Sequence, residues 1–279
     1  MRSVSVVNDA PSDAIDLDAY LARIGHEGPL TPTLETLRAL HRAHATAIPF
    51  ENLDILLGRP IRLDLASLQS KLVTARRGGY CFEQNTLFAA VLRRVGFRVT
   101  TLAARVRYTM TTLLPKTHMA IAVDLAPARY LADVGFGGHG LVEPLELVPD
   151  RAQQLATDWY RVAVDAEKQG PLVLQAKLPD GWTDLYAFTL EEHFPVDYEM
   201  ANHYTSTHPS SRFVVEPRAA RITPAGERVH VRGHKATVRR DGAIVEERDL
   251  SPSGLLDVLR DRFGIDLPAG TRFRPPPLC

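Results

Sequence analysis

A glycine pair directly before a helical pattern constrains this chain more than any other feature. Residues 77–85 read RGGYCFEQN, and apolar residues then recur at three- and four-residue spacing as far as Gly96, where a helix would end. Cys81 therefore lies in or just before the first turn of a buried helix. Free amide groups and the positive end of the helix dipole favour the nucleophilic thiolate there. Most free cysteines are instead small core residues, so this stretch alone leaves a reactive and an inert thiol equally open.

Composition narrows the classes of function. The chain has 279 residues, with 33 lysines and arginines against 33 aspartates and glutamates, so there is no electrostatic case for nucleic acid or an anionic membrane as a partner. No apolar run approaches the roughly 20 residues of a membrane helix, and residues 1–13 lack the apolar core of a secretory signal. The second of the two cysteines, Cys279, is the last residue and closely follows three prolines. This cysteine usage does not indicate a disulfide framework, and we expect a protein of the reducing cytoplasm.

The hydrophobic period changes along the chain. Residues 14–95 read as helices with short loops, with Gly25 as an end signal and Thr31-Pro32 and Asp64 as start signals. After Gly96 the period becomes two, and proline and glycine turn signals separate short strands at 97–103, 117–124, 130–134, 159–166, 171–177 and 183–189. Strands of this kind indicate an antiparallel barrel or sandwich.

The last third mixes both patterns. A short helix is predicted at 195–204, and a final helix opens at Ser251-Pro252 and ends at Gly264. Asp241-Gly242, between two apolar runs, is a strong hairpin signal. Strands are predicted at 213–216, 228–231, 235–240 and 243–246. Taken together, the patterns predict a fold of the α+β class.

Residues 135–140 match the G-x-G-x-x-G pattern of dinucleotide-binding sites but lack its context. In such a site a helix begins at the glycines, so that its N-terminus meets the pyrophosphate. Here Pro144 and Pro149 interrupt the following residues, and no helical period appears, which excludes the dinucleotide interpretation. The glycines instead predict a backbone that passes close to a ligand or to another chain segment.

His41 and His44 lie three residues apart on the second predicted helix, a spacing that could hold a metal ion. No carboxylate or thiol follows at a spacing that assigns a third ligand. We therefore predict that the two histidines lie on a solvated helix face, and we assign no metal ligands in this sequence.

A catalytic thiol needs a base within hydrogen-bond reach and a third group that holds the base. His118 shares one face of its strand with Ala120 and Ala122, so it has room beside it for another element. Asp133 lies in the next strand, in apolar sequence where an unpaired carboxylate would be costly. If the two strands form a hairpin, a two-residue loop at 125–126 places His118 and Asp133 directly opposite, and a four-residue loop at 125–128 makes them diagonal neighbours, about 7–8 Å apart. Either loop puts them on one face.

Cys81, His118 and Asp133, in this order and context, resemble the residues of the arylamine N-acetyltransferase family. The resemblance extends from about residue 15 into the C-terminal third, which is weakly diagnostic. It rests on motifs that are specific only together, at 48–53 (IPFENL), 77–85, 117–119 (THM) and 133–137 (DVGFG). Within these motifs, Arg77 and residues 50–52 are expected to support the site without reacting.

The resemblance implies a fold and a set of site residues. The family's fold is a helical bundle, a β-barrel and an α/β lid with a cysteine-proteinase-like triad, and we expect these three domains at 1–96, 97–205 and 206–279. By motif match, Cys81 is the nucleophile, His118 is its base and Asp133 orients His118. Phe136 and Gly137 would lie beside the acyl group and the pantetheine arm of the coenzyme.

The implied reaction is ping-pong acetyl transfer without a permanently bound cofactor. Acetyl-coenzyme A is the co-substrate, an acetyl-cysteine forms on Cys81, and an arylamine, arylhydrazine or arylhydroxylamine takes the acetyl group while His118 accepts the proton. Backbone amides near the sulfur could stabilise the oxyanion. No nucleic-acid or membrane partner is expected, an oligomer is compatible with the sequence, and the physiological acceptor is left open.

Two other classes of function share part of this pattern. A cysteine hydrolase of the papain or transglutaminase type uses the same triad but hands its acyl group to water, so release of acetate without an amine would favour it. A catalytically silent binding protein would carry a thiol that titrates like free cysteine. The combined motifs favour the transferase over both.

Overall fold

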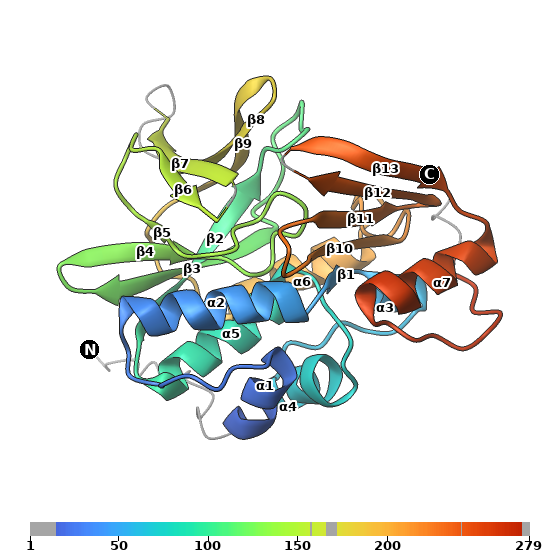
Figure 1. The fold of residues 1–279 in the computed structure, drawn as a ribbon, viewed down its shortest axis with the longest axis horizontal. Coiled ribbons are helices and arrows are strands. Elements are labelled where there is room, and N and C mark those ends of the chain that lie inside the picture. The colour runs from blue at the N-terminus through green and yellow to red at the C-terminus, as the bar shows by residue number, and fades with distance from the viewer. Residues whose placement is uncertain (1–14, 157, 166–171, 241, 275–279) are drawn as a thin grey trace, which may run out of the picture.

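The N-terminal part of the chain is helical, as its periodicity predicts. The structure is a computed structural model, and it describes residues 15–156, 158–165, 172–240 and 242–274 (Figure 1). Gly25 ends the first helix with φ 68°, in the left-handed region that favours glycine, and the Asp64 side chain caps a later one. The helices are α1 (Leu17–Ile24), α2 (Leu34–Ala47), α3 (Leu53–Leu56), α4 (Leu65–Leu68), the π-helix η2 (Gln69–Thr74) and α5 (Cys81–Val95).

The central part is an antiparallel sheet of eight strands that closes almost completely into a barrel. Its strand order is β5-β4-β3-β2-β9-β8-β7-β6, and α2 and α5 lie along one side of it (Figure 1). The strands are β2 (Arg98–Val106), β3 (His118–Leu125), β4 (Ala128–Ala132), β5 (Leu145–Glu146), β6 (Gln153–Leu155), β7 (Asp158–Val164), β8 (Leu172–Leu178) and β9 (Gly181–Phe188). Of the two predicted alternatives, barrel and sandwich, the barrel is therefore the one observed.

A second sheet follows α6 (Pro195–Thr207) and packs against the last helix, α7 (Pro252–Phe263). Its first strand comes from the N-terminal part, since Phe50 of β1 pairs with Ala220 of β10. The strands, in sheet order, are β1 (Phe50–Glu51), β10 (Arg218–Ile222), β11 (Arg228–Arg232), β12 (Lys235–Arg240) and β13 (Ala243–Asp249). The division into three domains stays a prediction, and β1 joins sheet partners on the far side of both expected boundaries.

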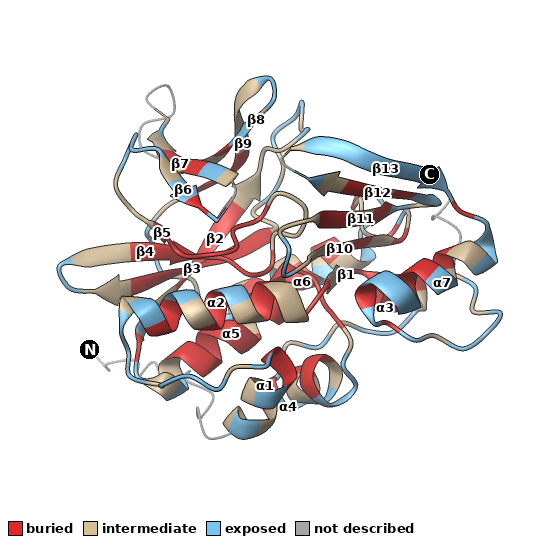
Figure 2. Ribbon diagram, viewed as in Figure 1, coloured by how far each residue is buried: buried red, intermediate tan, exposed pale blue. Residues whose placement is uncertain are grey.

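Strand β3 is buried on both faces, which gives it a central position in the molecule. Ile121 and Val123 pack into the core beneath the helices, whereas Ala120 and Ala122 pack inside the barrel. Figure 2 shows this burial along β3 and α5 and, by contrast, the exposure of the edge strand β13. No helix within the described ranges is both long enough and apolar enough to cross a membrane.

Two local predictions are wrong. Helix α2 begins at Leu34, because the Thr33 side chain, and not that of Thr31, accepts the hydrogen bond from Thr36 N. Residues 213–216 form a turn where a strand was expected. The Asn52 amide donates to the carbonyl oxygens of Phe213 and Glu216, at 2.8 and 3.0 Å, so a side chain satisfies these groups in place of a neighbouring strand.

The β3–β4 hairpin adopts the register of the second alternative, although only residues 126 and 127 lie between the paired positions. Leu125 pairs with Ala128 and Ile121 pairs with Ala132, so His118 and Asp133 are diagonal neighbours. Asp241, predicted to form a turn, lies outside the described residues, as does Cys279. The strands that precede and follow Asp241, β12 and β13, pair antiparallel.

Candidate active site

Cys81 is the first residue of α5, and only 3% of its surface is exposed. The start of the helix is fixed by Glu83, whose Oε2 accepts a hydrogen bond from Tyr80 N at 3.0 Å. The Cys81 Sγ lies 3.7 Å from the carbonyl oxygen of Thr117, the residue before His118. The thiol therefore lies at a helix N-terminus, where the dipole favours the thiolate, and beside the first residue of β3.

His118 and Asp133 meet across the β3–β4 hairpin. His118 Nε2 lies 2.7 Å from Asp133 Oδ2, and both side chains are almost completely buried. The Cys81 side chain also contacts the His118 ring. Because Nε2 contacts the carboxylate, Nδ1 is the ring nitrogen that is still available for another partner. The structure thus brings together the three residues that the motifs single out.

Burial and charge act in opposite directions on this pair. Burial alone would lower the pKa of His118, but the Asp133 carboxylate and then the Cys81 side chain raise it to about 10. Burial would also raise the pKa of Asp133, yet His118 and the hydrogen bonds from Asn85 and Gly135 hold it below its usual value. At neutral pH the pair is therefore an imidazolium and a carboxylate, and the positive charge favours an adjacent thiolate.

Asn85 belongs to the site, although no role of its own was predicted for it. It lies four residues after Cys81, on the same face of α5. Its Nδ2 donates to Asp133 Oδ1 at 2.9 Å and to Met119 O at 2.7 Å, and its Oδ1 accepts from Val134 N at 3.1 Å. One buried amide therefore joins α5 to β3 and to the two residues that follow β4. The signal in the sequence is its i+4 spacing from Cys81.

Residues 135–140, which we call the glycine loop, pass very close to other segments, as predicted. A Cβ on Gly135 would lie 2.7 Å from Cys81 Cα, and one on Gly137, where φ is 71°, would lie 2.9 Å from Phe50 Cγ. The Phe136 ring packs edge-on against His118, with 5.2 Å between ring centroids. The beginning of the loop therefore forms part of the wall around the triad.

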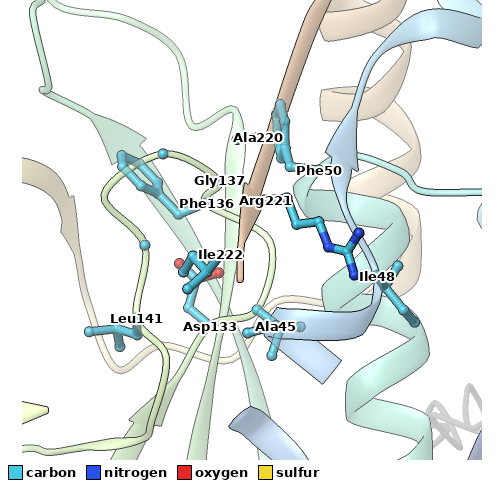
Figure 3. Close-up of a pocket in the computed structure, with 13 residues that line it drawn as sticks. Ala45, Ile48, Phe50, Asp133, Phe136, Gly137, Leu141, Ala220, Arg221 and Ile222 are labelled. Carbon is cyan, nitrogen blue, oxygen red and sulfur yellow. The ribbon is translucent and has the colours of Figure 1, made fainter. Parts of the chain in front are cut away.

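A pocket adjoins the glycine loop (Figure 3). It lies between the loop, the end of α2 and strand β10, with Phe50 and Ile222 among its apolar lining and Arg221 as its cationic group. Asp133, Phe136 and Gly137 line it, whereas Cys81 and His118 do not. Phe136 and Gly137, the residues expected to contact the donor, thus line this pocket, and Phe136 also packs against His118.

The prediction of a solvated face for His41 and His44 is wrong, because both side chains are fully buried. His41 Nε2 accepts from the backbone N of Asp133 at 3.1 Å, and His44 Nδ1 lies 2.8 Å from the Tyr20 hydroxyl. Burial lowers the pKa of His41 to about 4 and that of His44 to about 3, so both are neutral at pH 7. The described part of the chain holds no cluster of three or more potential metal ligands.

Buried ion pairs lie beneath the start of α5. Arg77 donates to Glu51 Oε1 at 2.7 and 3.1 Å and to Asp54 Oδ1 at 3.2 Å. Lys71 Nζ lies 2.8 Å from Asp54 Oδ2 and 2.7 Å from Glu83 Oε1. Since Glu83 also caps α5, these contacts connect Arg77 and residues 50–52 to the position of the thiol.

Comparisons with known proteins identify the kind of protein that carries this site. A family model described as N-acetyltransferase matches residues 33–272. The arylamine N-acetyltransferase of Mycolicibacterium smegmatis is 42% identical over 260 residues, which cover 91% of this chain and 93% of that protein. This chain belongs to the arylamine N-acetyltransferase family. The resemblance predicted from the motifs is thereby confirmed, as is the prediction of a transferase.

Solved arylamine N-acetyltransferase structures share the fold. The Nocardia farcinica enzyme matches with a TM-score of 0.86 and 42% identity over 92% of each chain. The Mycobacterium marinum enzyme, solved in complex with CoA, matches with a TM-score of 0.84 and 40% identity over 90% of this chain and 93% of that one. These matches confirm the predicted α+β class for this member of the family.

Proposed function

We propose that this enzyme transfers an acetyl group from acetyl-coenzyme A to arylamines, arylhydrazines or arylhydroxylamines through an acetyl group carried on Cys81. The observation that carries the proposal is the buried 2.7 Å contact between His118 and Asp133 beside a thiol at a helix start. The names of the relatives support the aromatic amine and the acetyl group. The CoA complex of the Mycobacterium marinum relative supports the donor.

The first half-reaction moves the acetyl group onto the enzyme. The Cys81 thiolate attacks the carbonyl carbon of the thioester, a new sulfur–carbon bond forms, and the bond to the coenzyme sulfur breaks. The departing coenzyme thiolate takes the proton from His118, whose charged form Asp133 stabilises until that moment. The products are acetyl-Cys81, free coenzyme A and a neutral imidazole.

The second half-reaction returns the enzyme to its starting state. The acceptor nitrogen attacks the acetyl carbon, the bond to Cys81 breaks, and His118 takes the proton that the nitrogen loses. Aromatic amines suit this step, because their low basicity leaves them uncharged at neutral pH. Cys81 is a free cysteine, as a nucleophile in a reducing cytoplasm would be.

Aromatic side chains beside the thiol favour an aryl acceptor. Phe213 packs against Phe50 and Tyr80, with ring centroids 6.0 and 5.7 Å apart, and these residues belong to one apolar cluster with Cys81. Offset and edge-on contacts with such rings are favourable for another aromatic group. We assign Phe136 and Gly137 to the donor side, because they adjoin His118 and the pocket of Figure 3.

Intact-protein mass spectrometry tests the covalent route. The enzyme mixed with acetyl-coenzyme A and no amine should gain the mass of one acetyl group on Cys81, and an added arylamine should remove it. The Cys81→Ser variant should show no adduct and nearly no turnover. Turnover by an enzyme that never shows the adduct would overturn the covalent route. An adduct lost to water as fast as to amines would favour a hydrolase instead.

A further inference from the structure

One arginine of the second sheet is buried without a role in the proposed chemistry. Arg228 is the first residue of β11, and its side chain is 7% exposed. Val229 and Val231, the odd-numbered residues of the strand, pack in the cluster that contains α7 residues. Successive strand residues point to opposite faces, so the Arg228 guanidinium points away from α7 and out of its own sheet.

The Arg228 guanidinium joins the glycine loop to the barrel. Nη1 donates to Gly138 O at 2.5 Å, and Nη2 donates to Gly140 O at 3.2 Å. Nη2 also lies 2.6 Å from Asp158 Oδ2 and 2.8 Å from the Tyr160 hydroxyl, and both residues belong to β7. A single side chain of the C-terminal third thus holds two carbonyls of a loop that begins beside Cys81.

The carbonyl groups of this loop are all engaged from residue 137 to residue 140. Gly137 O accepts from Gly140 N, and the Tyr160 hydroxyl lies 3.1 Å from His139 O and 3.0 Å from Gly140 O. A Cβ on Gly140 would lie 2.8 Å from Gly137 O, so the turn is too tight for a side chain there. Arg228 and Tyr160 together fix the backbone of the loop from outside the triad.

A charge buried to this degree is costly unless it is paired and its hydrogen bonds are made. Arg228 meets both conditions, because Asp158 supplies the opposite charge and accepts from Nε and Nη2, and three further oxygens accept hydrogen bonds from the guanidinium. Loss of the guanidinium would leave a carboxylate and two backbone carbonyls without this donor. The loop would then be free to move relative to Cys81 and His118, which α5 and β3 hold independently.

We propose that Arg228 is a positioning residue: it clamps the glycine loop to the barrel so that Phe136 and Gly137 hold the donor thioester in line with Cys81. The inference rests on the proposed placement of the donor beside those two residues. It makes the second sheet part of the donor site, although the triad lies entirely outside that sheet.

Two rate constants on the Arg228→Met variant test this role. The rate constant for acetylation of Cys81 by acetyl-coenzyme A should fall about 10- to 100-fold, because a displacement of about 1 Å in a positioning group has effects of that size. The rate constant for alkylation of Cys81 by iodoacetamide needs only the thiolate, so it should change by less than about threefold. The KM for acetyl-coenzyme A should rise, because acetylation of Cys81 becomes slower relative to the second half-reaction.

Two further variants separate positioning from simple destabilisation. Arg228→Lys should recover part of the acetylation rate, since an ammonium group can reach Asp158 but cannot fork between two carbonyls. Tyr160→Phe removes only a hydroxyl, so it should show the same split between the two rates with a smaller loss. Arg260→Met removes an exposed arginine of α7 that pairs with Asp257 and Asp261, and both of its rates should match the wild type.

Equal falls of the acetylation and alkylation rates in Arg228→Met and Tyr160→Phe would overturn the proposal in favour of a structural role. Wild-type acetylation in both variants would also overturn it. If the wild-type enzyme itself forms no acetyl-Cys81, the proposed covalent function fails. The affinity of each variant for acetyl-coenzyme A, measured by calorimetry, then tests whether Arg228 positions the donor site. Arg228→Met should bind the donor at least about tenfold more weakly than Arg260→Met, and equal affinities would overturn the clamp alone.

Discussion

Two sets of buried histidines, His118 alone and the pair of His41 and His44, have pKa values shifted in opposite directions. His118 bonds the Asp133 carboxylate, and its pKa is raised to about 10. His41 bonds the backbone N of the same residue, and its pKa is lowered to about 4, while that of His44 falls to about 3. All three are at most 2% exposed. Burial alone therefore keeps an imidazole neutral. His118 is a cation at neutral pH because its contact with the buried Asp133 carboxylate outweighs burial, and this positive charge can stabilise a thiolate.

Asp133→Asn should remove the difference between the two sets and have the largest effect. Without the carboxylate, burial dominates, and the pKa of His118 should fall below its ordinary value. The rate of Cys81 acetylation at pH 7 should then fall on the order of 10³–10⁴-fold, as when the aspartate of a serine-protease triad becomes asparagine. Rapid-quench mass spectrometry measures this rate.

A matched control lies on the same hairpin. Asp124 pairs with Arg129 near the surface, and Asp124→Asn should leave the acetylation rate within about twofold, since exposed pairs contribute little. A loss of less than tenfold in Asp133→Asn would show that the carboxylate does not set the charge of His118.

The pH dependence of stability should differ between the two sets of histidines. The pKa of folded His118 lies above its ordinary value, so its contribution is complete below about pH 6.5 and is lost as the pH rises through about 10. Urea unfolding should therefore show the wild type losing on the order of a few kcal/mol more than His118→Gln between pH 7 and pH 10. Parallel losses in the two proteins would contradict the assignment.

The neutral histidines should show the opposite trend with a smaller effect. Their contribution is complete above about pH 6.5 and is lost as the pH falls toward 4 for His41 and 3 for His44. His41→Leu should lower the free energy of unfolding by about 1–3 kcal/mol at pH 7, because it leaves the Asp133 amide unpaired. The variant should also lose less stability than the wild type when the pH falls. Urea unfolding at pH 7 and pH 5 measures both effects.

His41→Gln is the control for that variant, because its side-chain carbonyl can accept the same hydrogen bond. It should recover part of the stability at pH 7. A leucine variant that retains wild-type stability would show that the contact with Asp133 N contributes nothing.

Asp64→Ala should have the smallest effect and should leave both sets of histidines unaltered. The Asp64 carboxylate accepts from Ser67 N at 3.0 Å at the start of α4, and loss of such a cap costs about 1 kcal/mol. Thermal unfolding should detect this loss, while the acetylation rate stays at the wild-type value. A fall in the acetylation rate of this variant would show that the start of α4 affects the active site as well as the stability of the fold.

The sequence predicts those features that depend on neighbouring residues. Gly25, Asp64 and Ser251 mark helix ends where the structure has them, and alternation places His118 on one face of its strand. The contacts of His44 could not be predicted in this way, because its partners Tyr20 and Gln84 belong to other helices. Without knowledge of such partners, a polar residue in a helix is predicted to face solvent.

The same limit applies to longer-range contacts. Arg228 looks like an exposed strand residue in the sequence, and only the packing of β11 beside β7 and the glycine loop buries it. The turn at 213–216 likewise depends on Asn52, far earlier in the chain. The motifs point to the residues that we propose to react, whereas the groups that hold these residues come from segments that no local pattern connects.

The pairing of Phe50 with Ala220 sets an order of events during synthesis. A ribosome releases Phe50 early and Ala220 late, so strand β1, whose Glu51 N donates to Gly79 O, has no neighbour in its sheet during most of translation. A nascent chain that already contains Cys81, His118 and Asp133 still lacks β10, the strand that pairs with β1. A chain truncated after the barrel should therefore lack Ala220, Arg221 and Ile222, which form one side of the pocket beside the glycine loop.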